Sequence, residues 1–123
     1  MYENKKYSDF TKYIDIDAGL ARIRGNKNLY KRMLGLFAVS DEFAKLEEAI
    51  ENKDAETSGN IAHAIKGMSG NLSLDDVFHL SETLMGKFRA GKFDEELIAE
   101  YRKSLAITLD IIEDYSNYLD SEG

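Results

Sequence analysis

The residues with the clearest chemical potential lie in one stretch, residues 59–72, where His63 and Lys66 stand among glycines. The apolar residues of this stretch keep a helical spacing, which predicts a helix with one narrow buried stripe. The members of this stripe are Ile61, Ile65, Met68 and Leu72. At about 100° per residue, His63 falls on the opposite face, about one turn before Lys66. The stretch therefore predicts an exposed imidazole with a cation beside it.

The same outer face carries Gly67, Gly70 and Gly59. An interior glycine destabilises a helix by about 0.8–1 kcal/mol relative to alanine, so an ordinary solvated face would carry other residues. The missing side chains would leave space for another molecule to approach His63. We expect Gly67 to clear this approach, whereas Gly70 and Gly59 could extend the clearing or could allow close helix packing.

An exposed, neutral imidazole is a nucleophile that can accept a phosphoryl group on nitrogen. Lys66 can contact the incoming phosphoryl oxygens as a cation, because it lies one helical turn from His63. Phosphoryl transfer depends mainly on positioning and electrostatic stabilisation, and both could be supplied by this arrangement. His63 and Lys66 therefore have the chemistry that a phosphoacceptor and its stabilising cation require.

The second histidine, His79, has different neighbours, since Asp75 and Glu82 lie four residues before it and three residues after it. These carboxylates would repel a phosphoryl donor, so His79 is predicted to be an ordinary surface residue. Two histidines that are far apart, without a cluster of carboxylates, also make a poor metal site. No metal or other cofactor is expected on this chain, and a metal-assisted hydrolase is the weakest interpretation.

The composition narrows the class of protein. The chain has 123 residues, no cysteine, no proline and a formal net charge of −7. This length predicts one domain with a substantial core. The absence of cysteine excludes disulfides and thiolate chemistry and fits a cytoplasmic location. The negative charge argues against nucleic acid or an anionic membrane as a partner, and no apolar run approaches the roughly 20 residues of a membrane span.

Helical periodicity continues through most of the chain and predicts an all-α fold. After a lead segment at 1–15 that could contain a short helix, we expect helices at about 16–25, 27–52, 54–72, 74–90 and 94–119. The helix over 27–52 follows from a seven-residue repeat of Leu29, Leu36, Phe43 and Ile50. Residues 39–41 could kink this helix, although nothing in the sequence forces a break. Asp17 and Asp54 are expected as N-caps, and Gly91 as a left-handed residue that ends a helix.

The short connections between these helices predict antiparallel neighbours. We expect an antiparallel up-down four-helix bundle with an additional short N-terminal helix, divided into a lead segment at 1–15 and a bundle domain at 16–123. Ile98, Leu105, Ile112 and Leu119 form a regular seam that fits packing inside one bundle better than a dimeric coiled coil, so a monomer is expected. The initial methionine and the absence of a linker favour a free-standing protein.

The segment from His63 to Leu72, His-Ala-Ile-Lys-Gly-Met-Ser-Gly-Asn-Leu, resembles the motif of the histidine-containing phosphotransfer (HPt) domain family of bacterial two-component phosphorelays. That motif reads histidine, any residue, leucine or isoleucine, lysine and glycine, followed by small residues and an aliphatic residue. Residues 16–30 are similar to the opening of bacterial members, and residues 80–84 resemble the helix that follows the motif. One position departs from the pattern, because the family usually has glycine where Ser73 stands.

The resemblance implies a phosphorelay intermediate with an HPt-like bundle. His63 would accept a phosphoryl group from an aspartyl-phosphate on a receiver domain, of a response regulator or a hybrid sensor kinase, and would pass it to another receiver. The divalent metal would belong to the receiver partner. The chain lacks an ATP-binding signature, so it is expected to be a phosphocarrier without kinase activity of its own. A non-catalytic helical-bundle module that docks a receiver-like protein is the alternative.

Overall fold

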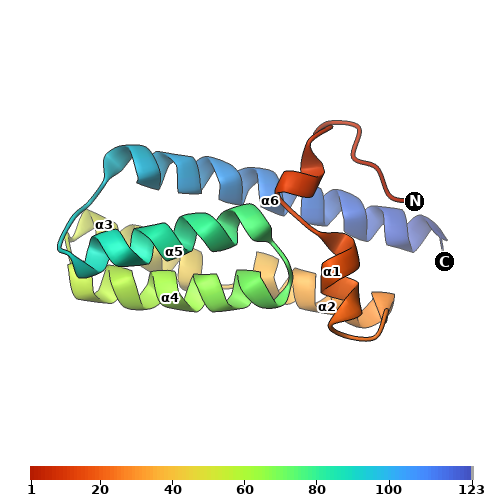
Figure 1. Cartoon of the computed structure of the whole chain (residues 1–123), viewed down its shortest axis with the longest axis horizontal. Helices are drawn as coiled ribbons and strands as arrows, with labels where there is room; N and C mark the ends of the chain where they lie inside the picture. Colours follow the sequence, from red (N-terminus) through yellow and green to blue (C-terminus); the bar gives the residue numbers. More distant parts are fainter. Residues whose placement is uncertain (123) are drawn as a thin grey trace.

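The computed structural model describes residues 1–122, and these residues form helices and connecting loops without a strand (Figure 1). The elements are a short 3₁₀ helix, Phe10–Lys12, followed by α1 (Ile16–Ala21), α2 (Lys27–Ala38), α3 (Glu42–Glu51), α4 (Ala55–Asn71), α5 (Asp75–Arg89) and α6 (Glu95–Glu122). None of these helices combines the length and the apolar character that a membrane crossing requires.

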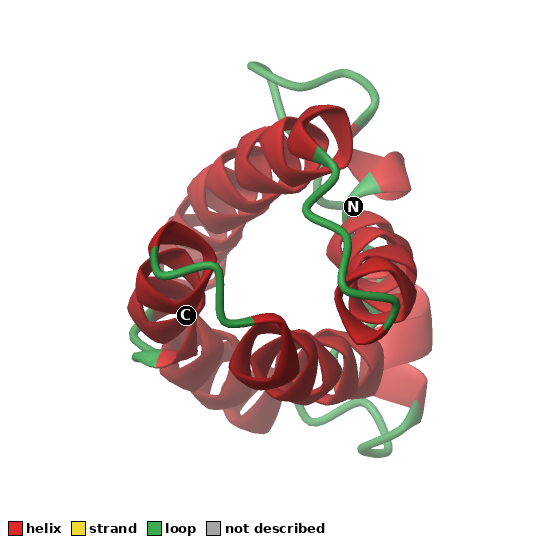
Figure 2. Ribbon diagram, turned by 90° about the vertical axis from the view of Figure 1, so that its left-hand side faces the viewer, coloured by secondary structure: helices red, strands yellow, loops and turns green. Residues whose placement is uncertain are grey.

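The helices form a bundle whose members surround a common core (Figure 2). In Figure 1, α4 and α5 lie side by side as an antiparallel hairpin, α6 runs along the molecule, and α2 and α3 follow one another on the far side. The short helix α1 lies across one end, close to α2. The predicted all-helical bundle with an additional N-terminal helix is therefore confirmed.

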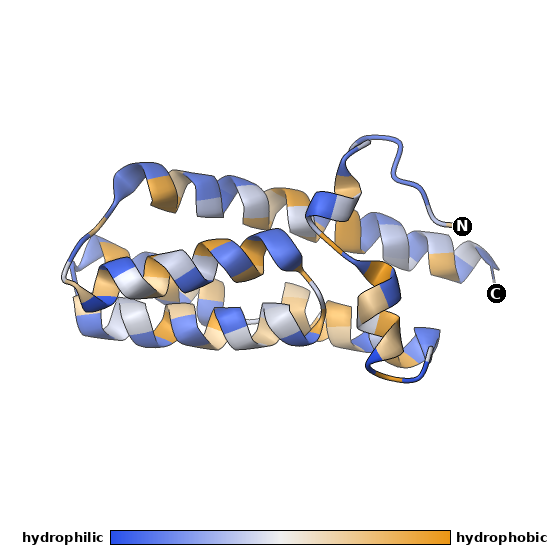
Figure 3. Cartoon of the chain, in the orientation of Figure 1, coloured by the Kyte–Doolittle hydropathy of each residue, from blue (hydrophilic) through white to orange (hydrophobic). Residues whose placement is uncertain are grey.

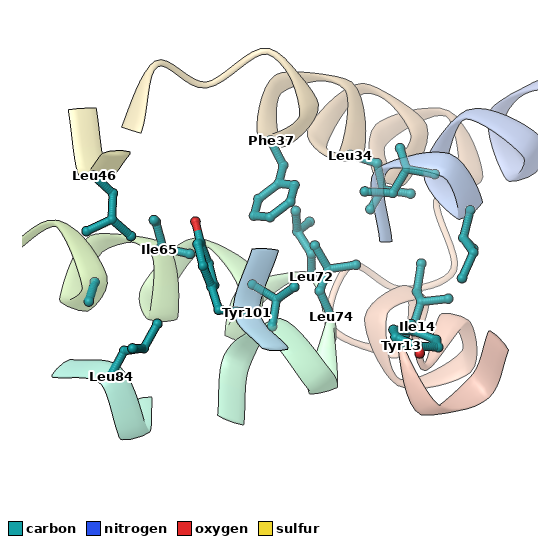
Figure 4. Packing of buried hydrophobic residues seen from close by; sticks show 14 of the residues in the cluster. Tyr13, Ile14, Leu34, Phe37, Leu46, Ile65, Leu72, Leu74, Leu84 and Tyr101 are labelled. Carbon is teal, nitrogen blue, oxygen red and sulfur yellow. The ribbon is translucent and has the colours of Figure 1, made fainter. Parts of the chain in front are cut away.

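The core lies between the helices, and apolar residues recur among polar ones along the helices (Figure 3). Leu46 of α3, Ile65 of α4, Leu84 of α5 and Tyr101 of α6 are fully buried and face one another near the middle of the bundle (Figure 4). The helices α2 to α6 each contribute buried residues to this core, so burial of apolar surface is the main favourable contribution to folding. The buried residues of α5 are Val77, Ser81, Leu84 and Phe88.

The prediction of one long helix over 27–52 is wrong, because the chain breaks between α2 and α3 at residues 39–41. In a continuous helix, Phe37 and Phe43 would point about 120° apart. The break brings their rings into an edge-to-face contact with centroids 5.1 Å apart. It also leaves Leu36 65% exposed, so the seven-residue repeat misidentified Leu36 as a core residue. The Ser40 hydroxyl accepts a hydrogen bond from the Glu42 N–H at 3.2 Å and so helps α3 to begin.

The helix ends follow local side-chain chemistry, with one correction. The Asp54 carboxylate accepts from the Thr57 N–H at 3.0 Å, so the predicted cap of α4 is confirmed. Gly91 has φ +75° after α5, as predicted. The predicted cap Asp17 is wrong, because Asp15 accepts from the Ala18 N–H at 3.0 Å and Asp17 lies inside the first turn. The helix begins at Ile16, where it was expected, and its cap lies two residues before the predicted one.

The N-terminal segment packs against α6. Tyr2 is buried, and its hydroxyl donates to the Asp114 carboxylate at 2.6 Å. Its ring makes edge-to-face contacts with Phe10, Tyr115 and Tyr118 at centroid distances of 5.0–5.2 Å. Residues 1–15 thus contribute aromatic side chains to the core of the bundle, and they lie at the end where α1 and α2 meet α6.

Candidate functional site

His63 lies on the outer face of α4 and is exposed to solvent. Its orientation follows from the opposite face of the helix, which is buried in the bundle at Ser58, Ile61, Ala62, Ile65 and Ser69. Helical geometry then directs the imidazole outward. The side chain lines an open hollow of about 500 Å³ between α4 and α5. The other lining residues are Arg22, Lys66, Gly67, Gly70, Asn71, Asp75, Phe78 and His79.

Lys66 shares this hollow with His63, as predicted from their spacing, but its ammonium group is turned toward α5. Lys66 Nζ lies 3.0 Å from Glu82 Oε2 in an ion pair. The same nitrogen lies 5.7 Å from the centroid of the Phe78 ring, which is a cation–π distance. The cation at the site is therefore held between α4 and α5 by two side chains of α5.

The three glycines near His63 occupy different surroundings. A Cβ atom on Gly67 would meet nothing within 4 Å, so this position leaves open space beside His63. A Cβ atom on Gly70 would lie 2.9 Å from Cδ1 of Phe78. Gly59 is buried, and a Cβ atom there would lie 3.5 Å from Cγ of Arg89. Gly70 therefore permits a close approach of α5, whereas a Cβ atom on Gly59 would make only an ordinary van der Waals contact with α5.

The C-terminal end of α4 is held by residues from α1 and α2. The Tyr30 hydroxyl donates to the Leu72 carbonyl at 2.7 Å, and Arg22 Nη1 donates to the Gly70 carbonyl at 2.9 Å. The Asp15 N–H donates to the Ser73 carbonyl at 2.9 Å. These bonds satisfy carbonyls that a helix end leaves without an intrahelical partner. They fix the far end of the hollow that contains His63.

Ser73, where the family pattern usually has glycine, has φ +57°. This left-handed conformation is unfavourable for a residue with a Cβ atom and is readily adopted by glycine. The hydroxyl of Ser73 is also buried, with no hydrogen-bond partner among residues 1–122. The turn between α4 and α5 is nevertheless formed, so the departure from the pattern does not prevent the helical hairpin that carries His63.

The sequence analysis missed two contributors to the hollow, Arg22 and Phe78. Arg22 lies just after α1, 48 residues before Gly70 in the sequence, so no helical periodicity connects it with His63. Phe78 lies on another helix, α5, and its closeness to Gly70 depends on how α4 and α5 pack. Partial burial raises the pKa of the nearby Asp75 carboxyl, and Asp15 adds to this rise, while His79 and Arg22 oppose it.

His79 is exposed, as predicted, and lies at the same hollow as His63. Its ring makes an edge-to-face contact with Phe78, with centroids 5.2 Å apart. Glu82, which the sequence placed beside His79, forms its ion pair with Lys66 instead. Within residues 1–122, no group of three or more histidine, aspartate or glutamate side chains is arranged to hold a metal ion.

A known protein family matches the part of the chain that carries His63. The model of the Hpt domain family matches residues 34–114, about two thirds of the chain. The chain belongs to the Hpt domain family. The match contains α3, α4 and α5 completely, together with His63 and the hairpin that forms the hollow. Searches among curated proteins and among solved structures found no match.

Membership in this family gives the general function of the chain. Hpt domains are histidine phosphotransfer modules of phosphorelays, and they interact with receiver domains. The matched range begins at Leu34, inside α2, so α1 and the N-terminal segment lie outside it. Arg22 therefore belongs to a part of the molecule that the family match does not describe.

Proposed function

We propose that His63 accepts a phosphoryl group from an aspartyl-phosphate on one receiver domain and passes it to a second receiver domain. The observation that supports this proposal is the exposure of His63 at an open hollow, with empty space at Gly67 and a cation at Lys66. His79 lies at the same hollow but comes from α5, and it lacks the histidine–lysine–glycine spacing of α4.

The transfer requires one bond to form and one to break. The lone pair of an unprotonated imidazole nitrogen of His63 would attack the phosphorus atom while the bond to the aspartyl oxygen breaks, and the aspartate would leave as a carboxylate. The other ring nitrogen would keep its proton. The second transfer reverses these changes toward another aspartate. The divalent metal that assists both steps would be bound by the receiver domain.

Each residue of the site has a separate role in this proposal. Lys66 would donate hydrogen bonds to the phosphoryl oxygens, because its ammonium group lies at the same hollow as His63. Gly67 would leave space for the phosphoryl group and for the surface of the receiver domain. Gly70 would contribute indirectly by allowing α5 to lie close to α4.

The proposal is tested by incubating the protein with a receiver domain that carries a radiolabelled aspartyl-phosphate. We expect label on this chain that is labile in acid and stable in base, as phosphohistidine is. The His63→Gln variant should take up no label, whereas the matched His79→Gln variant should be labelled like the parent.

Two outcomes would contradict the proposal. Label that persists in His63→Gln would exclude this histidine as the acceptor. Tight binding of several receiver domains without label on the parent would instead indicate the docking module without turnover.

A further inference from the structure

The ion pair between Lys66 and Glu82 connects the proposed phosphoryl site to α5. The two charged atoms are 3.0 Å apart, and the side chains are 26% and 49% exposed. Among the ion pairs of residues 1–122, this is the one that includes a residue of the hollow around His63. The cation nearest to His63 in sequence is therefore already paired before a phosphoryl group arrives.

We infer that Glu82 is a positioning residue for Lys66. The Glu82 carboxylate holds the Lys66 ammonium group in the hollow, and it then competes with the phosphoryl group for this ammonium group. This inference rests on the proposed function of His63. Lysine has a long, flexible side chain, and an ion pair restricts the volume that its ammonium group samples. Glu82 and the ring of Phe78 together keep this group on the α5 side of the hollow.

The pair is suited to an exchange of partners. An ammonium group has three N–H donors, so Lys66 can begin to contact a phosphoryl oxygen while it still contacts Glu82. Ion pairs between partly exposed side chains contribute little to stability and are readily broken. A phosphoryl group carries close to two negative charges, so it is the stronger competitor for the lysine. Lys66 would accordingly move from Glu82 toward phosphorylated His63.

The ion pair contributes little to the packing of α4 against α5. The close approach of the two helices is already provided by Gly70 and by buried side chains such as Ala62 and Leu84. Replacing the Glu82 carboxylate by an amide of nearly the same shape would leave these contacts in place. The substitution Glu82→Gln would therefore report on the charge of Glu82 and its hold on Lys66.

The experiment measures, at equilibrium, the ratio of phosphorylated protein to phosphorylated receiver domain. In Glu82→Gln, Lys66 no longer has a competing carboxylate, and we expect this ratio to rise about two- to fivefold, the range that corresponds to a surface ion pair. In Lys66→Ala the ratio should fall, and adding Glu82→Gln to Lys66→Ala should change it no further. Glu82→Asp, which keeps the charge, should remain close to the parent.

A matched control is Glu47→Gln. Glu47 pairs with Arg102 across α3 and α6 at 2.6 Å, has a side chain 45% exposed, and does not line the hollow. This variant should leave the ratio unchanged. Two results would overturn the inference. An unchanged ratio in Glu82→Gln would show that Glu82 does not compete for Lys66. A rise of the same size when Glu82→Gln is added to Lys66→Ala would show that Glu82 repels the phosphoryl group directly. Absence of label on the parent protein would instead contradict the proposed function itself.

Discussion

Gly67 and Gly70 lie about one turn apart on the same helix and both line the hollow, but the space around them differs. Gly70 faces α5, where a Cβ atom would lie within 3.0 Å of two ring atoms of Phe78. Gly67 faces solvent beside His63, with no atom within 4 Å of such a Cβ. One glycine therefore permits two helices to approach, and the other leaves a surface bare.

One glycine-rich helix face therefore serves two purposes: close packing against α5 and open space beside His63. Close packing of α5 at Gly70 places Phe78 in the hollow, and through the next turn of α5 it brings Glu82 to Lys66. The open space at Gly67 gives another protein access to His63. Substitutions at the two positions should accordingly separate folding from phosphoryl transfer.

The largest effect is expected for Gly67→Arg. An arginine here would occupy the approach to His63 and displace an incoming receiver domain, and misplacement of reacting groups by about 1 Å can lower a rate on the order of 100-fold. Stability should not fall, because arginine favours helix over glycine by about 0.8 kcal/mol. Transfer rates and urea denaturation would measure both properties. Normal transfer in this variant would contradict a clearing role for Gly67.

The second prediction concerns Gly70→Val, which should destabilise the fold. The added side chain would overlap Phe78, and overpacking of this kind typically costs about 1–3 kcal/mol in the free energy of unfolding. Gly67→Val is the matched control, since the same side chain there meets open space and should leave stability nearly unchanged. Equal urea midpoints for the two variants would show that the space around Gly67 and the space around Gly70 do not differ in this way.

A smaller, stabilising effect is expected for Gly67→Ala. Alanine improves helix propensity at an interior position by about 0.8–1 kcal/mol, and no atom opposes the added methyl group. The midpoint of thermal unfolding should rise, as measured by circular dichroism. Gly70→Ala should gain less or lose stability, because its methyl group would press on the Phe78 ring. A larger gain at Gly70 than at Gly67 would reverse the comparison.

The smallest effect is expected for Ser73→Gly, just beyond the two glycines. Relief of the left-handed strain is partly offset by the greater freedom of glycine in the unfolded chain, which leaves a gain of about 0.5 kcal/mol. Removal of the hydroxyl breaks no hydrogen bond among residues 1–122. Chemical denaturation would detect the gain, and a loss of stability would show that the serine side chain supports the turn.

Much of the fold could be predicted because its signals are local. The Asp54 cap acts on an N–H three residues away, and Gly91 acts through its own backbone angle. The repeat that predicted one helix over 27–52 failed because each residue of that range fits a helix, while the break depends on contacts with other parts of the fold. The Ser40 hydroxyl, for example, donates to Met68 Sδ of α4 at 3.9 Å.

The candidate site divides in the same way. The spacing of His63, Lys66 and Gly67 follows from the helical period, so one exposed face carrying all three was predictable from the sequence. Arg22, Phe78 and Glu82 come from other elements, and no pattern within residues 59–72 indicates their presence at the hollow.

The sequence by itself determined that the chain is helical, which helix carries His63 and that this side chain points outward. These properties depend on interactions within about four residues, and such interactions are present in any helix with this pattern. The tertiary structure alone decided which glycine is bare and which is packed, where the long helical pattern breaks, and which carboxylate holds Lys66. Those outcomes depend on the distances between α4 and its neighbours, which are set by the packing of the whole core.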